Sequence, residues 1–146
     1  MRQTSKFVRR IRLVCRHFGL IARAVVALLF FRMLLWAFRY RQIAKLIRVQ
    51  IESPPSPANP YLFSWAVRHA SRIVPGASCL TQALALQYLL ARKGTSVVIR
   101  VGVAYGAGQQ RDAHAWVVLD DIILLGGTSE SLKGYAVLTD LTPSFK

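Results

Sequence analysis

Apolar and polar positions follow two different periods along this chain. Residues 18–40 and 78–94 carry apolar side chains on nearly every helical face, whereas residues 97–103 carry a large apolar side chain at every second position. A helical spread of apolar residues predicts buried helices, and a period of two predicts a strand with one face in a core. Helical patterns come first and strand patterns follow, so we expect an α+β fold.

The segment 78–94 has both a start signal and a stop signal for a helix. Ser78 is a good N-cap because its hydroxyl can accept a hydrogen bond from an early backbone N–H, and Pro75–Gly76 ends whatever precedes it. At the other end, Arg92 suits the negative pole of the helix dipole, and Gly94 suits the left-handed residue that closes a helix. We expect this helix to be buried inside a domain.

A proline-rich stretch divides the chain. Residues 53–59 hold three prolines within four positions, which forbid a helix and favour an extended, semi-rigid connection. We therefore predict a hydrophobic, basic helical region over 1–52, a linker over 53–59 and a globular domain over 60–146.

Further elements are expected within the globular domain. Asn59 as N-cap and Pro60 at the first position open a helix that runs to about Arg72. Asp120–Asp121 has the length of a two-residue hairpin turn. The alternating segments predict strands at residues 97–103, 113–119 and 122–125 and a short one at 135–138. A loop is expected over 104–111.

Charge is unevenly distributed along the chain. The formal net charge is +14, and residues 1–50 hold twelve Lys or Arg side chains and no acidic one. The remainder holds the other eight basic residues together with all six acidic ones. This asymmetry points to an anionic surface, either a membrane or a nucleic acid. The arginines alternate with large aliphatic side chains and no recognition motif is visible, so we do not expect nucleic-acid binding.

Residues 18–40 have the length of a membrane span, which takes about 20 apolar residues. Arg23 and Arg32 interrupt them, each at a cost of roughly 2.5–3.5 kcal/mol near a bilayer centre, and the charge-free run 24–31 is too short to span. No small-residue cleavage site follows, so this is not a signal peptide. We expect helices packed on the domain, after an amphipathic helix over 1–17. An interfacial helix on anionic lipid and a true span are the alternatives.

The cysteines and histidines form no metal motif. Cys15 and Cys79 lie in regions of different character, and His17, His69 and His114 are scattered. Neither a disulfide framework nor a zinc motif matches this pattern, so we expect no metal and no other cofactor. His69 is expected to be a packed histidine rather than a catalytic one. We expect the chain in the reducing cytoplasm. Association with a membrane through residues 18–40 is compatible with that location.

Cys79 and His114 are the candidate reactive pair. Cys79 lies in the first turn of the expected helix, where free N–H groups and the helix dipole favour the thiolate, the nucleophilic form. His114, near the start of the second strand, is the candidate base, as in the Cys–His pairs that carry out acyl transfer. Backbone N–H groups at the helix start could stabilise the oxyanion. The alternative is that Cys79 is simply a small buried hydrophobe.

Three motifs together resemble a known family. They are Ser78–Leu86 (SCLTQALAL), the strand 98–103 (VIRVGV) and Ala113–Val117 (AHAWV). Over roughly 62–138 the chain resembles the transglutaminase-like, papain-like cysteine proteases that act as leader peptidases in lasso-peptide biosynthesis. It is similar to the stand-alone peptidase half of that B protein. The resemblance implies a cysteine helix packed on a small antiparallel sheet, here preceded by apolar, basic helices.

The resemblance also implies an activity and its residues. It indicates a thiol peptidase that removes the leader from a ribosomally made precursor peptide and feeds a separate lasso cyclase. Cys79 would be its nucleophile and His114 its base.

The family pattern includes an acid that orients the histidine, and here the chain departs from it. If Asp120–Asp121 form a tight turn, His114 lies opposite Gly127, several residues away from the turn carboxylates. The facing positions 126–128 hold no carboxylate. A longer turn would bring Asp121 or Asp120 within reach of His114. Asp112 lies on the same strand face as His114, and Glu130 would reach it if the chain curls back after the glycines. These four residues are the candidates for the third member.

Partners and competing functions follow from the same comparison. Full-length B proteins carry a small leader-recognition domain, which residues 1–52 do not resemble because they lack a strand-rich pattern. We therefore expect a separate leader-recognition protein to dock on the apolar N-terminal region, with the precursor peptide and the lasso cyclase as further partners. Two alternatives stay open: a transglutaminase-like acyl transferase that uses an amine acceptor, and a non-catalytic membrane or interaction protein.

Overall fold

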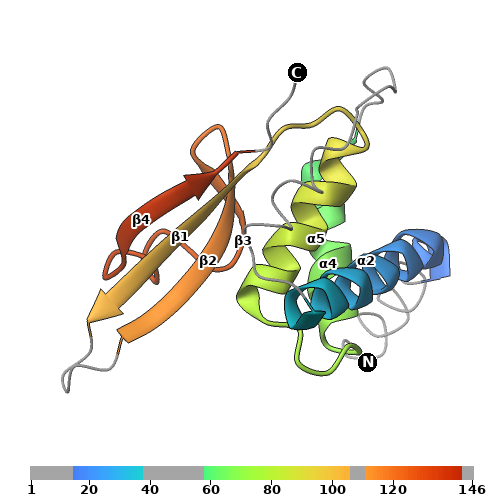
Figure 1. The fold of residues 1–146 in the computed structure, drawn as a ribbon. Helices are drawn as coiled ribbons and strands as arrows, with labels where there is room; N and C mark the ends of the chain where they lie inside the picture. The colour runs from blue at the N-terminus through green and yellow to red at the C-terminus, as the bar shows by residue number, and fades with distance from the viewer. Residues whose placement is uncertain (1–14, 38–57, 106–110, 143–146) are drawn as a thin grey trace, which may run out of the picture.

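The computed structural model describes residues 15–37, 58–105 and 111–142. Three helices lie on one side of a four-stranded antiparallel sheet, which confirms the α+β fold (Figure 1). In chain order the elements are α2 (Phe18–Ala37), α4 (Pro60–Ser71), α5 (Cys79–Ala91), β1 (Val98–Tyr105), β2 (Arg111–Leu119), β3 (Ile122–Leu125) and β4 (Ala136–Leu141). The helix expected over 1–17, the linker 53–59 and the loop 104–111 lie mostly outside the described residues.

The predicted capping residues begin and end the helices. The Ser78 hydroxyl accepts a hydrogen bond from the Thr81 N–H at the start of α5, at 3.2 Å, and Gly94 closes the helix with φ +76°. The Asn59 side chain accepts from the Tyr61 and Leu62 N–H groups at the start of α4. Because these caps satisfy backbone groups that a helix leaves free, they fix where both helices begin.

The sheet has the order β3-β2-β1-β4. The Asp120–Asp121 turn is the predicted two-residue hairpin, with positive φ angles of 44° and 67°, and it joins β2 to β3. β3 has the predicted bounds, whereas β4 runs on to Leu141 and pairs with β1. A register shift between Val117 and Val118 interrupts the β2–β3 pairing. Since β3 pairs only with residues 117–119, the beginning of β2 has a free edge.

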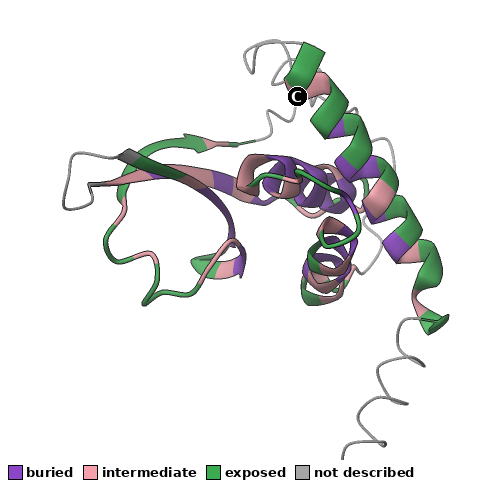
Figure 2. Ribbon diagram, turned by 90° about the horizontal axis from the view of Figure 1, so that it is seen from below, coloured by how far each residue is buried: buried purple, intermediate pink, exposed green. Residues whose placement is uncertain are grey.

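One apolar core joins all three helices to the sheet. Nine of the 13 residues of α5 are buried, and α5 packs on β2 on one side and on α2 and α4 on the other. Five residues of α2 enter the same core: Ile21, Ala24, Ala27, Leu28 and Phe31. The buried positions of α2 lie on the side of the helix that faces the rest of the domain (Figure 2). Residues 18–37 are therefore packed on the domain, as expected, along one side of the helix.

The two faces of the sheet differ in character. Ile99, Ala115 and Val117 belong to the core under the helices. Side chains alternate along a strand, so His114 and Trp116 lie on the opposite, outer face, where their rings stack with centroids 6.3 Å apart. The fold thereby brings the polar and aromatic side chains of β2 together on one face.

Candidate active site

Cys79 is the first residue of α5 and is half-buried. A side chain of α5 holds the loop before Cys79 in place: Gln82 donates a hydrogen bond to the Ala77 carbonyl at 3.0 Å. Ser78 caps the Thr81 N–H, so in the described part of the chain the N–H groups of Cys79 and Leu80 have no hydrogen-bond partner. Two donors at the helix start are therefore available to an anion formed beside the Cys79 sulfur.

His114 is half-buried near the start of β2 and is held by a backbone carbonyl. Its Nε2 lies 2.5 Å from the Gly126 oxygen. A carbonyl oxygen only accepts hydrogen bonds, so Nε2 must carry the hydrogen. In the neutral imidazole the lone pair then lies on Nδ1. This is a tautomer in which the ring can accept a proton at Nδ1 without losing its anchor.

Gly126 can hold His114 only because it has no side chain. Its φ is +100°, a conformation that residues with a Cβ rarely adopt. A Cβ at this position would lie 2.6 Å from the Trp116 Cβ and 2.8 Å from the Ala115 oxygen. Glycine therefore allows the end of β3 to come close enough to β2 for its carbonyl to reach His114.

Two of the four carboxylates considered as the third member lie at the far end of β2, and the other two bond to other side chains. Asp120 and Asp121 occupy the hairpin turn at the far end of β2. Asp112 accepts a 2.6 Å hydrogen bond from the Tyr135 hydroxyl, and Glu130 forms an ion pair with Lys133. Within residues 58–105 and 111–142, no carboxylate is hydrogen-bonded to His114. The Gly126 carbonyl takes the place where an orienting acid was expected.

Tyr135 is the site residue that sequence reasoning missed. Its ring centroid lies 5.6 Å from that of His114, and its hydroxyl donates to Asp112. The hydrogen bond to Asp112 raises the pKa of Tyr135, with further contributions from burial and from negative charge on Asp112 and Cys79. Tyr135 therefore adjoins the His114 ring and bonds to the Asp112 carboxylate.

His114 and Tyr135 lie together near the beginning of β2, where β3 does not pair with it, and Cys79 begins the helix α5 that packs on β2. The described residues show no hydrogen bond between the thiol and the imidazole themselves. The residues brought together here are an anchored imidazole and a phenol–carboxylate pair, on the strand against which the helix of Cys79 packs.

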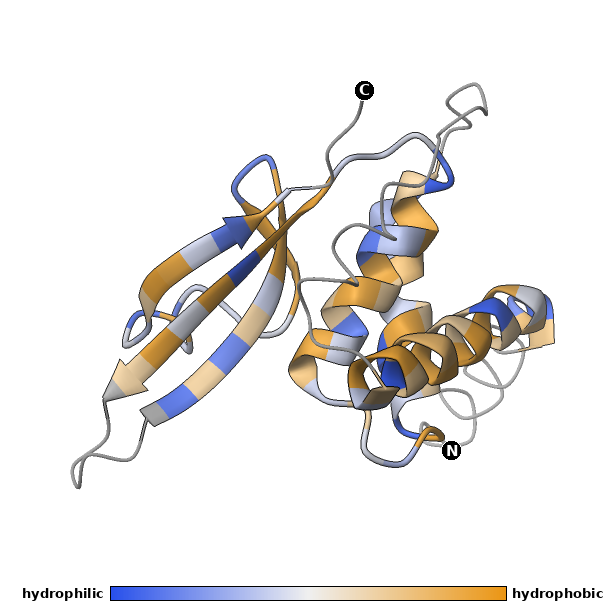
Figure 3. Ribbon diagram, viewed as in Figure 1, coloured by the Kyte–Doolittle hydropathy of each residue, from blue (hydrophilic) through white to orange (hydrophobic). Residues whose placement is uncertain are grey.

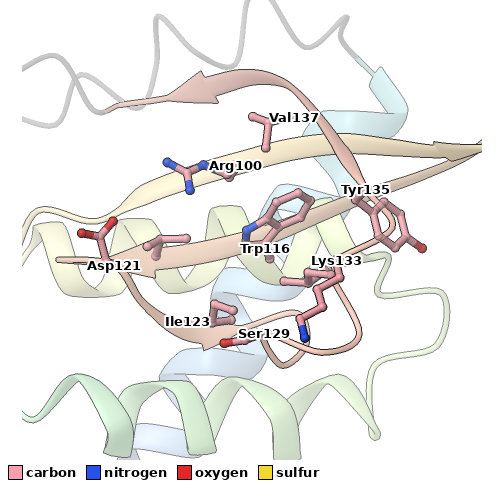
Figure 4. Close-up of a pocket in the computed structure, with 10 residues that line it drawn as sticks. Arg100, Trp116, Asp121, Ile123, Ser129, Lys133, Tyr135 and Val137 are labelled. Atoms are coloured by element: carbon pink, nitrogen blue, oxygen red, sulfur yellow. The ribbon is translucent and has the colours of Figure 1, made fainter.

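A shallow cavity of about 220 Å³ continues the site along the outer face of the sheet. Figure 4 shows Trp116 in its middle, with Tyr135 toward one end and Asp121 toward the other. Val137 adds apolar lining, and Arg100 adds a guanidinium that is paired with Asp140. The aromatic wall of this cavity is formed by the two rings that adjoin His114.

The other histidine considered is structural. His69 on α4 is half-buried, its ring lies 4.3 Å from that of Trp65, and its Nδ1 bonds to the Trp65 carbonyl at 2.9 Å. It is packed, as the sequence predicted. Among the residues that the structure describes, no group of three or more His, Cys, Asp or Glu side chains could hold a metal ion.

Comparison with known proteins identifies a family. A family model described as the transglutaminase-like superfamily matches residues 24–140, from within α2 to β4. No curated protein and no solved structure matches the chain. The superfamily includes cysteine peptidases and acyltransferases, and its members are typically cysteine-dependent enzymes.

Proposed function

Since the chain belongs to the transglutaminase-like superfamily, we propose that it is a cysteine peptidase that removes the leader from a ribosomally made precursor during lasso-peptide maturation. The observation that carries the proposal is the anchored imidazole. The Gly126 carbonyl holds the Nε2–H of His114 beside the Tyr135 ring, and Cys79 begins the helix α5 that packs on β2, the strand of His114. These are the parts that a thiol acyl-transfer enzyme requires.

In the proposed reaction, the Nδ1 atom of His114 takes the proton of the Cys79 thiol. The thiolate attacks the scissile carbonyl, and the resulting oxyanion accepts hydrogen bonds from the Cys79 and Leu80 N–H groups. The peptide C–N bond then breaks, and the imidazolium returns its proton to the leaving amine. The leader stays attached to sulfur as a thioester until water, deprotonated by His114, hydrolyses it and regenerates the thiol.

The Gly126 carbonyl would do part of the work of an orienting carboxylate. As an acceptor it keeps the hydrogen on Nε2 and fixes the ring, so Nδ1 remains the basic atom. As a neutral dipole it stabilises the imidazolium less than a full negative charge would. Asp112 supplies that charge nearby, through the Tyr135 hydroxyl that bonds to it. We therefore assign Asp112 and Tyr135 a positioning role in the reaction.

The choice of a leader peptide as substrate is supported by the sequence motifs. The cysteine motif Ser78–Leu86 and the histidine motif Ala113–Val117 resemble those of the lasso leader peptidases. We expect the chain to act in the cytoplasm with a separate leader-recognition protein and to pass its product to the lasso cyclase. An acyl transferase would form the same thioester and differ only in the final acceptor.

The test is cleavage of the precursor, read by mass. The full chain is incubated with the precursor peptide, with and without the recognition protein, and we expect two fragments whose masses add up to the precursor plus one water. Cys79→Ala and His114→Ala should each abolish cleavage with an unchanged circular dichroism spectrum, whereas Cys15→Ala should cleave normally.

Two outcomes would contradict parts of this proposal. Full cleavage by the Cys79→Ala protein would exclude the thiol mechanism, and a fragment heavier by an added amine instead of water would indicate an acyl transferase. Tight binding of the leader by this chain alone would remove the need for a separate recognition protein.

A further inference from the structure

The outward side of α2 is apolar along its whole length. Its exposed large side chains recur at helical spacing and include Trp36, which is 85% exposed, and Phe18, which is 68% exposed. Val26, Leu29, Phe30 and Met33 continue the stripe between them. Figure 3 shows the apolar character of this helix, and Figure 2 shows its exposed side facing away from the other helices.

We propose that α2 binds the surface of an anionic membrane and lies in the plane of the interface. The first argument is the position of its two arginines. Arg23 and Arg32 are nine residues apart, which at 3.6 residues per turn puts them on opposite sides of the helix. Both are exposed and flank the apolar stripe. Arginine at such a border can keep its charge among lipid phosphates while the stripe enters the acyl region.

The second argument is the charge of the sequence around α2. Five basic residues lie within 1–14 and four more within 39–48, and residues 1–50 contain no acidic side chain. Anionic lipid offers phosphates for this charge and acyl chains for the stripe, so one surface matches both features. A nucleic acid would match only the charge.

The third argument distinguishes lying on the membrane from crossing it. By length and composition α2 is the one helix among the described residues that could span a membrane. It buries Leu28 and Phe31 completely, or almost so, against α4 and α5, however, and a span would remove both side chains from that core. An in-plane helix keeps its core contacts and covers only the exposed stripe. This inference concerns location and does not depend on the proposed peptidase activity.

Vesicle co-sedimentation of the full chain tests the proposal. We expect binding to phosphatidylcholine vesicles that contain phosphatidylglycerol to be at least about tenfold tighter than to phosphatidylcholine alone. Adding salt should weaken it. On binding, Trp36 fluorescence should shift to shorter wavelength, and Trp36→Phe should remove most of that shift.

A matched pair of triple variants locates the surface. Val26→Gln/Phe30→Gln/Met33→Gln removes three exposed apolar side chains from α2 and should lower vesicle affinity at least about tenfold. Ile73→Gln/Ile122→Gln/Leu138→Gln removes three exposed apolar side chains elsewhere and should leave binding unchanged. Circular dichroism should show that both variants are folded.

Several results would overturn the proposal. They are no vesicle binding, equal affinity for neutral and anionic vesicles, equal losses in the two triple variants, or burial of Trp36 by self-association in the absence of lipid. None of these would affect cleavage of the precursor in solution, so the two proposals fail separately.

Discussion

The helices α2 and α5 are both apolar on most of their faces, yet the fold uses them differently. Nine of the 13 residues of α5 are buried, against five of the 20 residues of α2. α5 lies between the sheet and the other two helices, whereas α2 is covered on one side only. An apolar composition thus predicts that a helix is shielded from water, but it does not predict whether the protein's own core or another surface shields it.

The same difference separates chemistry from location. Cys79 is the first residue of α5, which packs on β2, so the surroundings of α5 decide whether the thiol can react. The outward stripe of α2 carries no candidate catalytic group and presents apolar side chains to the outside. Changes in α5 and around its start should therefore affect activity, and changes on the exposed side of α2 should affect binding to its surroundings without unfolding the domain.

The largest expected effects are losses of stability when buried leucines are replaced by alanine, compared with the same change at an exposed leucine. Leu84→Ala in α5 and Leu28→Ala in α2 should each lower the free energy of unfolding by about 2–5 kcal/mol, because both side chains are almost completely buried. Leu29→Ala, at a residue that is 47% exposed, should cost less than about 1 kcal/mol. Urea unfolding followed by circular dichroism measures all three. A small loss for Leu28→Ala would show that α2 does not unfold together with the domain.

The next largest effect concerns Gly126, whose carbonyl anchors His114, the candidate base for Cys79 at the start of α5. Gly126→Ala forces a Cβ against Trp116 and moves the carbonyl that anchors His114. A displacement of about 1 Å can cost roughly 100-fold, so we expect kcat/KM for precursor cleavage to fall by about that factor. Gly134→Ala is the control, since a Cβ there meets no atom within 4 Å. Equal rates for the two variants would leave the Gly126 carbonyl without a role.

The two cysteines give the third contrast. Cys15, just before α2, is exposed, and Cys79 is half-buried, so exposure alone predicts faster alkylation of Cys15. If the helix start and His114 stabilise the thiolate, iodoacetamide should label Cys79 about tenfold faster instead. His114→Ala should remove that advantage. Mass spectrometry of peptides from a labelling time course measures both rates, and equal labelling of the two thiols in the unsubstituted chain would count against activation of Cys79.

Local signals in the sequence predicted most of the fold. Ser78, Asn59 and Gly94 mark helix ends through bonds or angles that need no distant partner, and the Asp120–Asp121 turn is equally local. The length of β4 could not be predicted in this way. Residues 139–141 carry a weak strand pattern and join the sheet because β1 offers them a free edge.

The candidate site could be predicted only where side chains carry the signal. The types and positions of Cys79 and His114 predict them as the candidate pair, but a backbone carbonyl leaves no trace in residue identity. The adjacent glycines at 126 and 127 were the available hint that the chain approaches another strand closely. The chain does turn back after them, yet it brings Tyr135 to His114 and pairs Glu130 with Lys133. Such long-range packing cannot be read from local patterns.

The smallest expected effect comes from an ion pair outside both helices. On the outer face of the sheet Arg100 pairs with Asp140 at 2.9 Å, and this hydrogen bond lowers the pKa of Asp140. A lowered carboxyl pKa stabilises the fold at pH values above the ordinary pKa of about 4, and the contribution disappears as the pH falls through the lowered value. Both side chains are about one-third exposed or more, so solvent screening limits the pair to less than about 1 kcal/mol.

Asp140→Asn should therefore lower the free energy of urea unfolding slightly at pH 7, and by progressively less as the pH falls below the ordinary pKa of Asp. Arg100→Gln should show the same pH dependence, because either change removes the pair. If core packing of α5 and α2 supplies the stability, both losses should stay well below that of Leu84→Ala. A loss at pH 7 as large as the Leu84→Ala loss would mean that the β1–β4 edge contributes as much to the fold as the helices do.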